Sequence, residues 1–172
     1  MQLDNLQAVR FAVSLSLHFT AKRPAYKLRL MAALEVKNTM NFEIKSDNEY
    51  RIVFSDRSYD SEGWLTHYTV SLYSPHMSGA VRVENSSYGV SPEKLFKSIE
   101  NEWRGWKGEK SWGSLEGEFD LCAVSDSTGH ITLTARIFSG LSVPSSRLET
   151  ELNIESGRSD IIAKQAAEFF KC

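Results

Sequence analysis

Two side chains of this sequence are chemically suited to acid–base work, Glu116 and His130. Asp126 could orient the imidazole, and Glu116, with Ser114 beside it, could bond the backbone of the neighbouring loop. A general base must lie within hydrogen-bond reach of its partner. Glu116 opens one strand of a predicted hairpin while His130 adjoins its turn, which separates them by about 30 Å. We therefore expect no dyad: His130 is predicted to bond Asp126 in the turn, and Glu116 either fixes the neighbouring loop or faces a partner.

Other kinds of chemistry have less support in the sequence. His18, His67 and His76 are scattered, without the short His or Cys spacings that hold a metal, so we expect no metal and no cofactor. Nucleotide-binding glycine motifs and a nucleophile elbow are absent from the sequence. The two cysteines do not form a disulfide framework, and free thiols are favoured over a bridge. These observations favour a non-enzymatic protein.

A stretch rich in tryptophan and glycine contains the remaining candidate residues, at Trp103, Trp106 and Trp112. Trp103 is predicted to lie in the core, because it continues the apolar stripe of a helix. Trp106 and Trp112 could either anchor the core or stack on a sugar, a base or a partner side chain. The glycines here are predicted to serve the backbone conformation, since no phosphate-binding spacing is present.

Two helices are predicted. The first begins at Ser91-Pro92-Glu93, because Ser favours the N-cap and Pro the first helical position, and it ends at Gly105. Its predicted apolar stripe consists of Leu95, Phe96, Ile99, Trp103 and Trp106. A second helix follows Ser159-Asp160 and carries the apolar residues Ile162, Ala163, Ala166, Phe169 and Phe170.

Period-two alternation predicts strands on both sides of the first helix. The segments before it resemble an antiparallel meander: 42–44, 50–54, 64–73 and 80–84. Those after it form a hairpin of 115–123 and 131–137 around a turn at 126–129, followed by a strand over 148–154. The predicted fold is α+β, with two layers: a curved antiparallel sheet of five to eight strands and two helices packed on one face.

The face of such a sheet that the helices leave open can be solvated. It would present Glu118, Asp120, Thr132, Thr134 and Arg136. The net charge of −2 argues against nucleic acid as a partner, because phosphate binding requires a basic surface.

Residues 1–40 differ from the rest, with an excess of Lys and Arg where residues 41–172 have an excess of Asp and Glu. Strict alternation from Val9 to Thr20 favours a hairpin, but an extension ahead of the domain stays open as an alternative. We therefore divide the chain into residues 1–40, a basic hairpin or extension, and residues 41–172, a single α+β domain. No apolar run is long enough to span a membrane, and a cytoplasmic protein is expected.

Three motifs follow the first helix in order: Trp103-x-Gly105-Trp106-x-Gly108, then Trp112-x-Ser114-Leu115-Glu116-Gly117, then a hairpin with Asp126 and Gly129-His130. In this order the chain resembles a bacterial family of unknown function, over about residues 41–172. A looser similarity links it to antitoxin (immunity) proteins. The resemblance implies a fold and no activity.

The function predicted from these observations is a binding or interaction protein, in which an immunity-type inhibitor places an acidic face on a basic toxin. The alternative is a module for a small, carbohydrate-like ligand, which it stacks on Trp112 and Trp64. The candidate binding residues are Trp106, Trp112, Ser114, Glu116, Glu118, Asp120 and His130.

Overall fold

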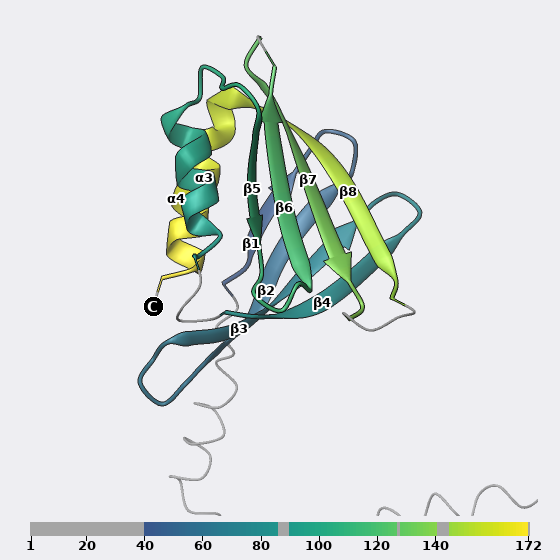
Figure 1. The fold of residues 1–172 in the computed structure, drawn as a ribbon, viewed down its shortest axis with the longest axis vertical. Coiled ribbons are helices and arrows are strands. Elements are labelled where there is room, and N and C mark those ends of the chain that lie inside the picture. The colour runs from purple at the N-terminus through teal and green to yellow at the C-terminus, as the bar shows by residue number, and fades with distance from the viewer. Residues whose placement is uncertain (1–39, 86–89, 127, 141–144, 172) are drawn as a thin grey trace, which may run out of the picture. The chain divides into compact units, whose positions relative to one another are not determined.

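The computed structural model describes residues 40–85, 90–126, 128–140 and 145–171, which belong to a compact unit formed by residues 38–172. Apart from Met40, the hairpin or extension predicted for residues 1–40 lies outside the described residues. The elements of this unit, drawn in Figure 1, are eight strands, two α-helices and one short 3₁₀ turn.

The strands form two antiparallel sheets of four, each in simple sequential order. The first sheet contains β1 (Phe42–Lys45), β2 (Arg51–Tyr59), β3 (Leu65–Tyr73) and β4 (Ser78–Glu84). The second contains β5 (Glu109–Gly113), β6 (Phe119–Ser125), β7 (His130–Phe138) and β8 (Arg147–Glu155). The helices are α3 (Glu93–Asn101) and α4 (Ser159–Phe169), and the 3₁₀ turn η1 (Ser156–Arg158) leads into α4.

The predicted meander, the hairpin around residues 126–129, the following strand and both helices are present in the structure. The single predicted sheet is instead divided in two, because β4 and β5 do not pair. Alternation of apolar residues fixes which face of a strand is buried, and it carries no information about which strands pair across a long connection.

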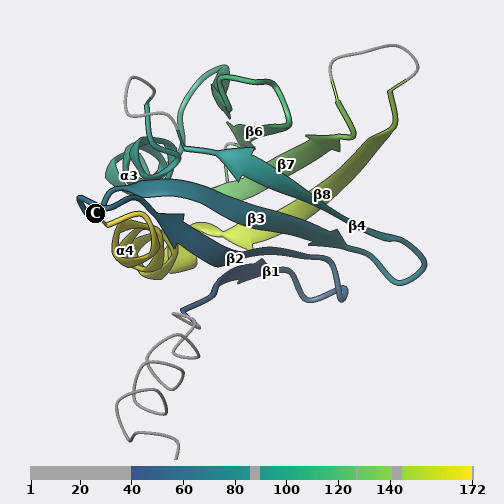
Figure 2. The ribbon, with the colours of Figure 1, turned by 90° about the horizontal axis from the view of Figure 1, so that it is seen from below.

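The two helices pack against each other beside the sheets. In Figure 1 they run side by side along one side of β5, and Figure 2 shows them together at one end of both sheets. Helix α4 contacts β1 and helix α3 contacts β5, while the sheets touch each other through β3 and β4 on one side and β7 and β8 on the other. The helix pair therefore fills the opening where the edges β1 and β5 diverge.

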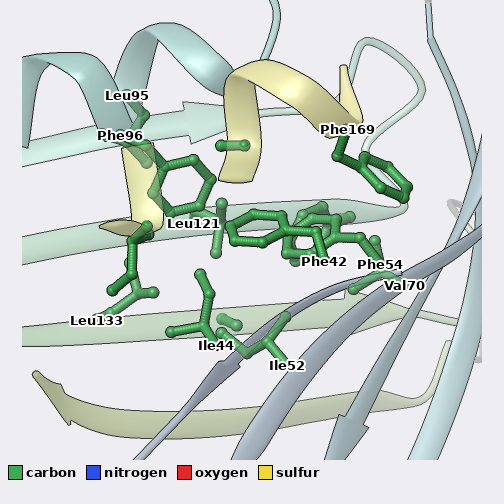
Figure 3. Close-up of a cluster of buried hydrophobic side chains, with 14 of the residues drawn as sticks. Phe42, Ile44, Ile52, Phe54, Val70, Leu95, Phe96, Leu121, Leu133 and Phe169 are labelled. Atoms are coloured by element: carbon green, nitrogen blue, oxygen red, sulfur yellow. The ribbon is translucent and has the colours of Figure 1, made fainter. Parts of the chain in front are cut away.

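One hydrophobic core joins both sheets and both helices (Figure 3). Phe54 of β2 lies at its centre, with ring centroids 5.8 Å from Phe119, 6.0 Å from Phe169 and 5.7 Å from Phe170. Phe42 stacks on Phe54 at 5.0 Å. Aromatic pairs of this kind stabilise a core by more than the apolar area that they bury. Both sheets and the end of helix α4 therefore depend on the same cluster of rings.

Arg57 of β2 attaches the end of helix α4 to the first sheet. Its guanidinium donates a hydrogen bond of 3.0 Å to the carbonyl of Phe169 and lies 5.2 Å from that residue's ring centroid. A cation at a helix C-terminus also complements the helix dipole. This contact holds Phe169 and Phe170 in the core.

Candidate functional site

The tryptophan- and glycine-rich stretch links helix α3 to strand β5 and differs from its prediction. The helix ends at Asn101, and the following backbone bonds run from Trp103 to Glu100 and from Gly105 to Glu102, with three-residue spacing. This tightening turns Trp103 off the apolar stripe, which leaves it 50% exposed. The prediction that Trp103 belongs to the core is therefore wrong.

Trp106 packs against the core from a half-buried position. The ammonium of Lys110 lies 5.3 Å from its ring centroid and also donates to the hydroxyl of Ser98 and the carboxylate of Glu102, both at 2.6 Å. These bonds connect β5 to α3 across the intervening turn. The ammonium of Lys110 thus lies over the Trp106 ring, and the bonds to Ser98 and Glu102 fix its position.

Trp112 is fixed at both ends of its ring system. Its indole N–H donates to the carbonyl of Val90, and its ring lies 5.8 Å from Phe119 in the core. The residue belongs to β5, a strand that was not among those predicted from the sequence. Held in this way, Trp112 anchors the start of α3 to the second sheet.

Ser114, Glu116 and Glu118 lie in the turn between β5 and β6. The Ser114 hydroxyl donates to Glu118 at 2.6 Å and accepts from the backbone N–H of Phe119 at 3.1 Å. Glu116 is exposed in this turn. Glu118 also accepts a bond of 3.5 Å from the backbone N–H of Glu84, so it ties the turn to β4.

Asp126 lies in the turn between β6 and β7, and His130 is the first residue of β7; the predicted contact between them is present. One carboxylate oxygen of Asp126 accepts bonds from the backbone N–H of Thr128 at 2.8 Å, from its hydroxyl at 2.7 Å and from the N–H of His130 at 2.9 Å. These bonds, the Thr128 hydroxyl foremost, hold the pKa of Asp126 well below its ordinary value. His130 Nδ1 lies 3.2 Å from Asp126, and Nε2 lies 3.4 Å from Glu155.

The β6–β7 register places Phe119 opposite Ile137 at one end and Ser125 opposite Ile131 at the other. The β5–β6 turn with Glu116 and the turn with His130 thus lie at opposite ends of the hairpin. The expected absence of a Glu116–His130 dyad is confirmed.

The second sheet presents an acidic outer face. Since Leu121, Leu133 and Leu152 face the core, the residues that alternate with them face outward. Carboxylates outnumber arginines on this surface, which we name the acidic face and define by Glu109, Asp120, Arg136, Arg147, Glu149, Glu151 and Glu155. The predicted solvated residues Asp120, Thr132 and Arg136 are partly exposed here, whereas Thr134 is 7% exposed.

Arg136 bridges two of these acids across three strands. Its Nε donates to Glu149 at 2.6 Å and its Nη1 to Asp120 at 3.2 Å. The bond from Arg136 lowers the pKa of Glu149, and the same bond raises the pKa of Arg136. The residue opposite Glu151 on β7 is Thr134, which carries no charge.

Cys122 lies at the middle of the acidic face, opposite Ser111 on one side and Thr134 on the other. It is 8% exposed. Burial, with a bond to Glu109, raises the pKa of its thiol to about 11. The thiol is therefore protonated at neutral pH and behaves as a small apolar group within an acidic surround.

The acidic residues of β8 were not among the binding residues predicted from the sequence. Their signal was nevertheless present, because Glu149, Glu151 and Glu155 alternate with buried apolar residues of the same strand. What sequence alone lacked was the pairing of β8 with β7, which brings them beside Arg136 and Asp120.

No group of three His, Cys, Asp or Glu side chains in the described part of the chain is arranged to hold a metal ion. Among the same residues, no helix combines the length and apolar character needed to cross a membrane.

Comparison with known protein families gives a match over residues 43–172 to a family of unknown function (DUF6228). The match spans most of the chain, and the protein belongs to this family. No curated protein and no solved structure matches the chain.

Proposed function

We propose that the protein is a non-enzymatic binding protein of the immunity type, which covers a basic surface of a toxin with its acidic face. The observation that carries this proposal is the outward row Glu149, Glu151 and Glu155 on β8, together with Asp120 on β6 and Glu109 on β5 of the same sheet. Complementary charge across an interface speeds association and disfavours partners of like charge.

The rigidity of this surface supports the same function. The side chains project from a four-stranded sheet whose opposite face is buried in the core. Groups held on regular strands lose little conformational freedom when a partner binds, which lowers the cost of association. His130 and Asp126 bond to each other and to their own turn, a structural role.

The proposal is tested by co-expressing the protein with a toxin encoded beside its gene and by measuring association at several salt concentrations. The double variant Glu151→Lys/Glu155→Lys is expected to lose protection and to associate at least about tenfold more slowly at low salt. A matched control, Glu62→Lys/Glu168→Lys, makes the same charge change at exposed residues away from this face. A complex that both variants form equally well contradicts the proposal.

A second candidate is a carbohydrate-like ligand that stacks on Trp64. This residue is 54% exposed in the β2–β3 turn, where Asp60 accepts from its backbone N–H at 2.9 Å. Trp112, the other residue predicted for this role, has its indole N–H bonded to Val90 and its ring on Phe119. Titration of tryptophan fluorescence with sugars and nucleotides tests this candidate, and Trp64→Phe should abolish any response.

A further inference from the structure

Strand β4 has an open edge. The backbone N–H of Asn85 bonds the carbonyl of Thr66, and the N–H of Ser74 bonds the carbonyl of Met77. In an antiparallel pair such bonded positions recur at every second residue, so the odd-numbered residues of β4 bond to β3. The backbone groups of the even-numbered residues point the other way, and the Glu84 N–H does reach outward, to Glu118.

The backbone groups of Ser78, Ala80 and Arg82 therefore form a row of donors and acceptors along the sheet edge. Within the described part of the chain, no backbone bond to the N–H of these three residues joins β4 to any element other than β3. A row of this kind is complementary to one partner structure, another extended strand.

The other three edge strands are protected in ways that β4 is not. Strand β1 has four residues and contacts α4. Strand β5 is bonded to α3 through Lys110, and β8 projects charged residues, a common protection against edge pairing. Strand β4 has seven residues, of which the first three, Ser78-Gly79-Ala80, are small and uncharged, while its charged residues Arg82 and Glu84 lie toward its other end.

A cavity of about 320 Å³ lies beside this part of β4, between the two sheets. Its apolar lining comes from Met77 and Val81 on one side and from Ile137 and Leu148 on the other. Gly79 makes the arrangement possible, because a Cβ there would lie 3.0 Å from the Leu148 side chain. The volume is within the range of pockets that accept small ligands or single side chains.

One basic side chain lies at the rim of this cavity. Arg147 is the charged residue of its lining; its side chain is 60% exposed, and its Nη2 lies 3.5 Å from Glu149. A carboxylate bound near Arg147 would gain a charge-assisted contact. The open edge, the apolar cavity and the rim arginine together define the chemistry of an occupant.

We propose that β4 binds an extended peptide segment of a protein partner, which adds as a fifth strand to the first sheet. Its backbone pairs with Ser78, Ala80 and Arg82, an apolar side chain enters the cavity lined by Ile137 and Leu148, and an acidic side chain contacts Arg147. The pairing edge belongs to the first sheet, and the site shares only Arg147 with the acidic face, so it goes beyond the function proposed above.

The test uses the full chain and synthetic eight-residue peptides of alternating Thr and Val, with one central Leu and an Asp or a Lys two positions away from it. Binding is measured by fluorescence anisotropy. The Asp peptides are expected to bind more tightly than the Lys peptides, and Arg147→Glu should reverse that order. A control that leaves the protein unchanged uses two peptides, one N-methylated at the odd-numbered and one at the even-numbered residues. Only one of these two peptides retains the backbone N–H groups that would pair with β4.

Ala80→Pro removes one outward N–H and leaves every bond between β4 and β3 in place, so it should weaken binding by at least about tenfold. Ala80→Thr retains the N–H and should bind as the parent does. The proposal is overturned if no peptide binds below about 1 mM, or if Ala80→Pro or both N-methylated peptides bind normally. Concentration-dependent dimers abolished by Ala80→Pro, without peptide binding, would assign the edge to a second copy and also overturn it.

Discussion

Replacing Lys110 by Met tests how the tryptophan- and glycine-rich stretch is held to helix α3. Met retains most of the aliphatic stem of Lys and removes the ammonium, which bonds Ser98 and Glu102 at 2.6 Å and lies 5.3 Å from the ring centroid of Trp106. The Lys110 side chain is 17% exposed, so water replaces these contacts poorly.

The expected loss follows from the three contacts. A hydrogen bond from a charged donor to a hydroxyl contributes about 1.5 kcal/mol. The ion pair with the half-exposed Glu102 and the contact with the Trp106 ring each contribute about 0.5 kcal/mol. Lys110→Met should therefore lower the free energy of unfolding by about 2.5 kcal/mol.

The matched control is Lys97→Met, the same substitution at a lysine whose ammonium pairs with Glu100 three residues along α3, with the Lys97 side chain 61% exposed. That pair is expected to contribute no more than about 0.5 kcal/mol. Urea unfolding followed by circular dichroism and tryptophan fluorescence measures both variants, with an unchanged m-value as the sign of intact two-state behaviour. If Lys110→Met destabilises the protein no more than Lys97→Met does, the described link between β5 and α3 is incorrect.

Three further predictions concern individual residues. In thermal unfolding, Gly105→Ala should destabilise the protein by about 1 kcal/mol more than Gly108→Ala. Both glycines have positive φ, but of the two only Gly105 would place a Cβ against a backbone atom, the Asp126 carbonyl oxygen at 3.2 Å. Equal losses of stability would contradict this. Folding lowers the pKa of Asp126 below its ordinary 3.8, so its carboxylate stabilises the fold above about pH 4 and this contribution is lost on acidification. Asp126→Asn should therefore lower stability at pH 7 and flatten the fall between about pH 5 and pH 2, and an unchanged acid profile would contradict the assignment. With a pKa of about 11, Cys122 should react with iodoacetamide about 100-fold more slowly at pH 8 than a free thiol, as measured by peptide mass spectrometry; rapid alkylation would show that it is not buried.

The sequence predicted local structure best where a long alternating pattern lay between turns. The hairpin of β6 and β7 and the turn at Asp126 were predicted correctly, because alternation and turn residues both act over short distances. Strand β5 was missed: its sequence Glu109–Gly113 has a single large apolar residue, and its strand character depends on pairing with β6.

The helix end shows a similar limit. Trp103 and Trp106 continue the helical spacing of Ile99, yet the backbone tightens after Asn101 and Gly105 adopts a positive φ. A periodic pattern can extend past the end of a helix, since it records side-chain types and not backbone hydrogen bonds. The exposure of Trp103 could not be predicted for this reason.

The candidate site was predicted in part. Ser114 fixes its turn through Glu118, because the turn geometry brings the carboxylate of the residue four positions on next to the hydroxyl. The acidic face and the open edge of β4 both depend on which strands pair and which remain at the edges. The pairing of strands that lie far apart in the chain is the part of a fold that is hardest to predict from a single sequence.

The position of Phe169 and Phe170 has a consequence for synthesis of the protein. Both rings pack on Phe54 of the second strand, more than one hundred residues earlier in the chain. Contacts between such distant residues slow folding, because a long loop must close before they form. All eight described strands precede α4 in the chain, so a chain that ends before Phe169 would leave the shared core open on the helix side, an apolar surface of the kind on which chaperones act.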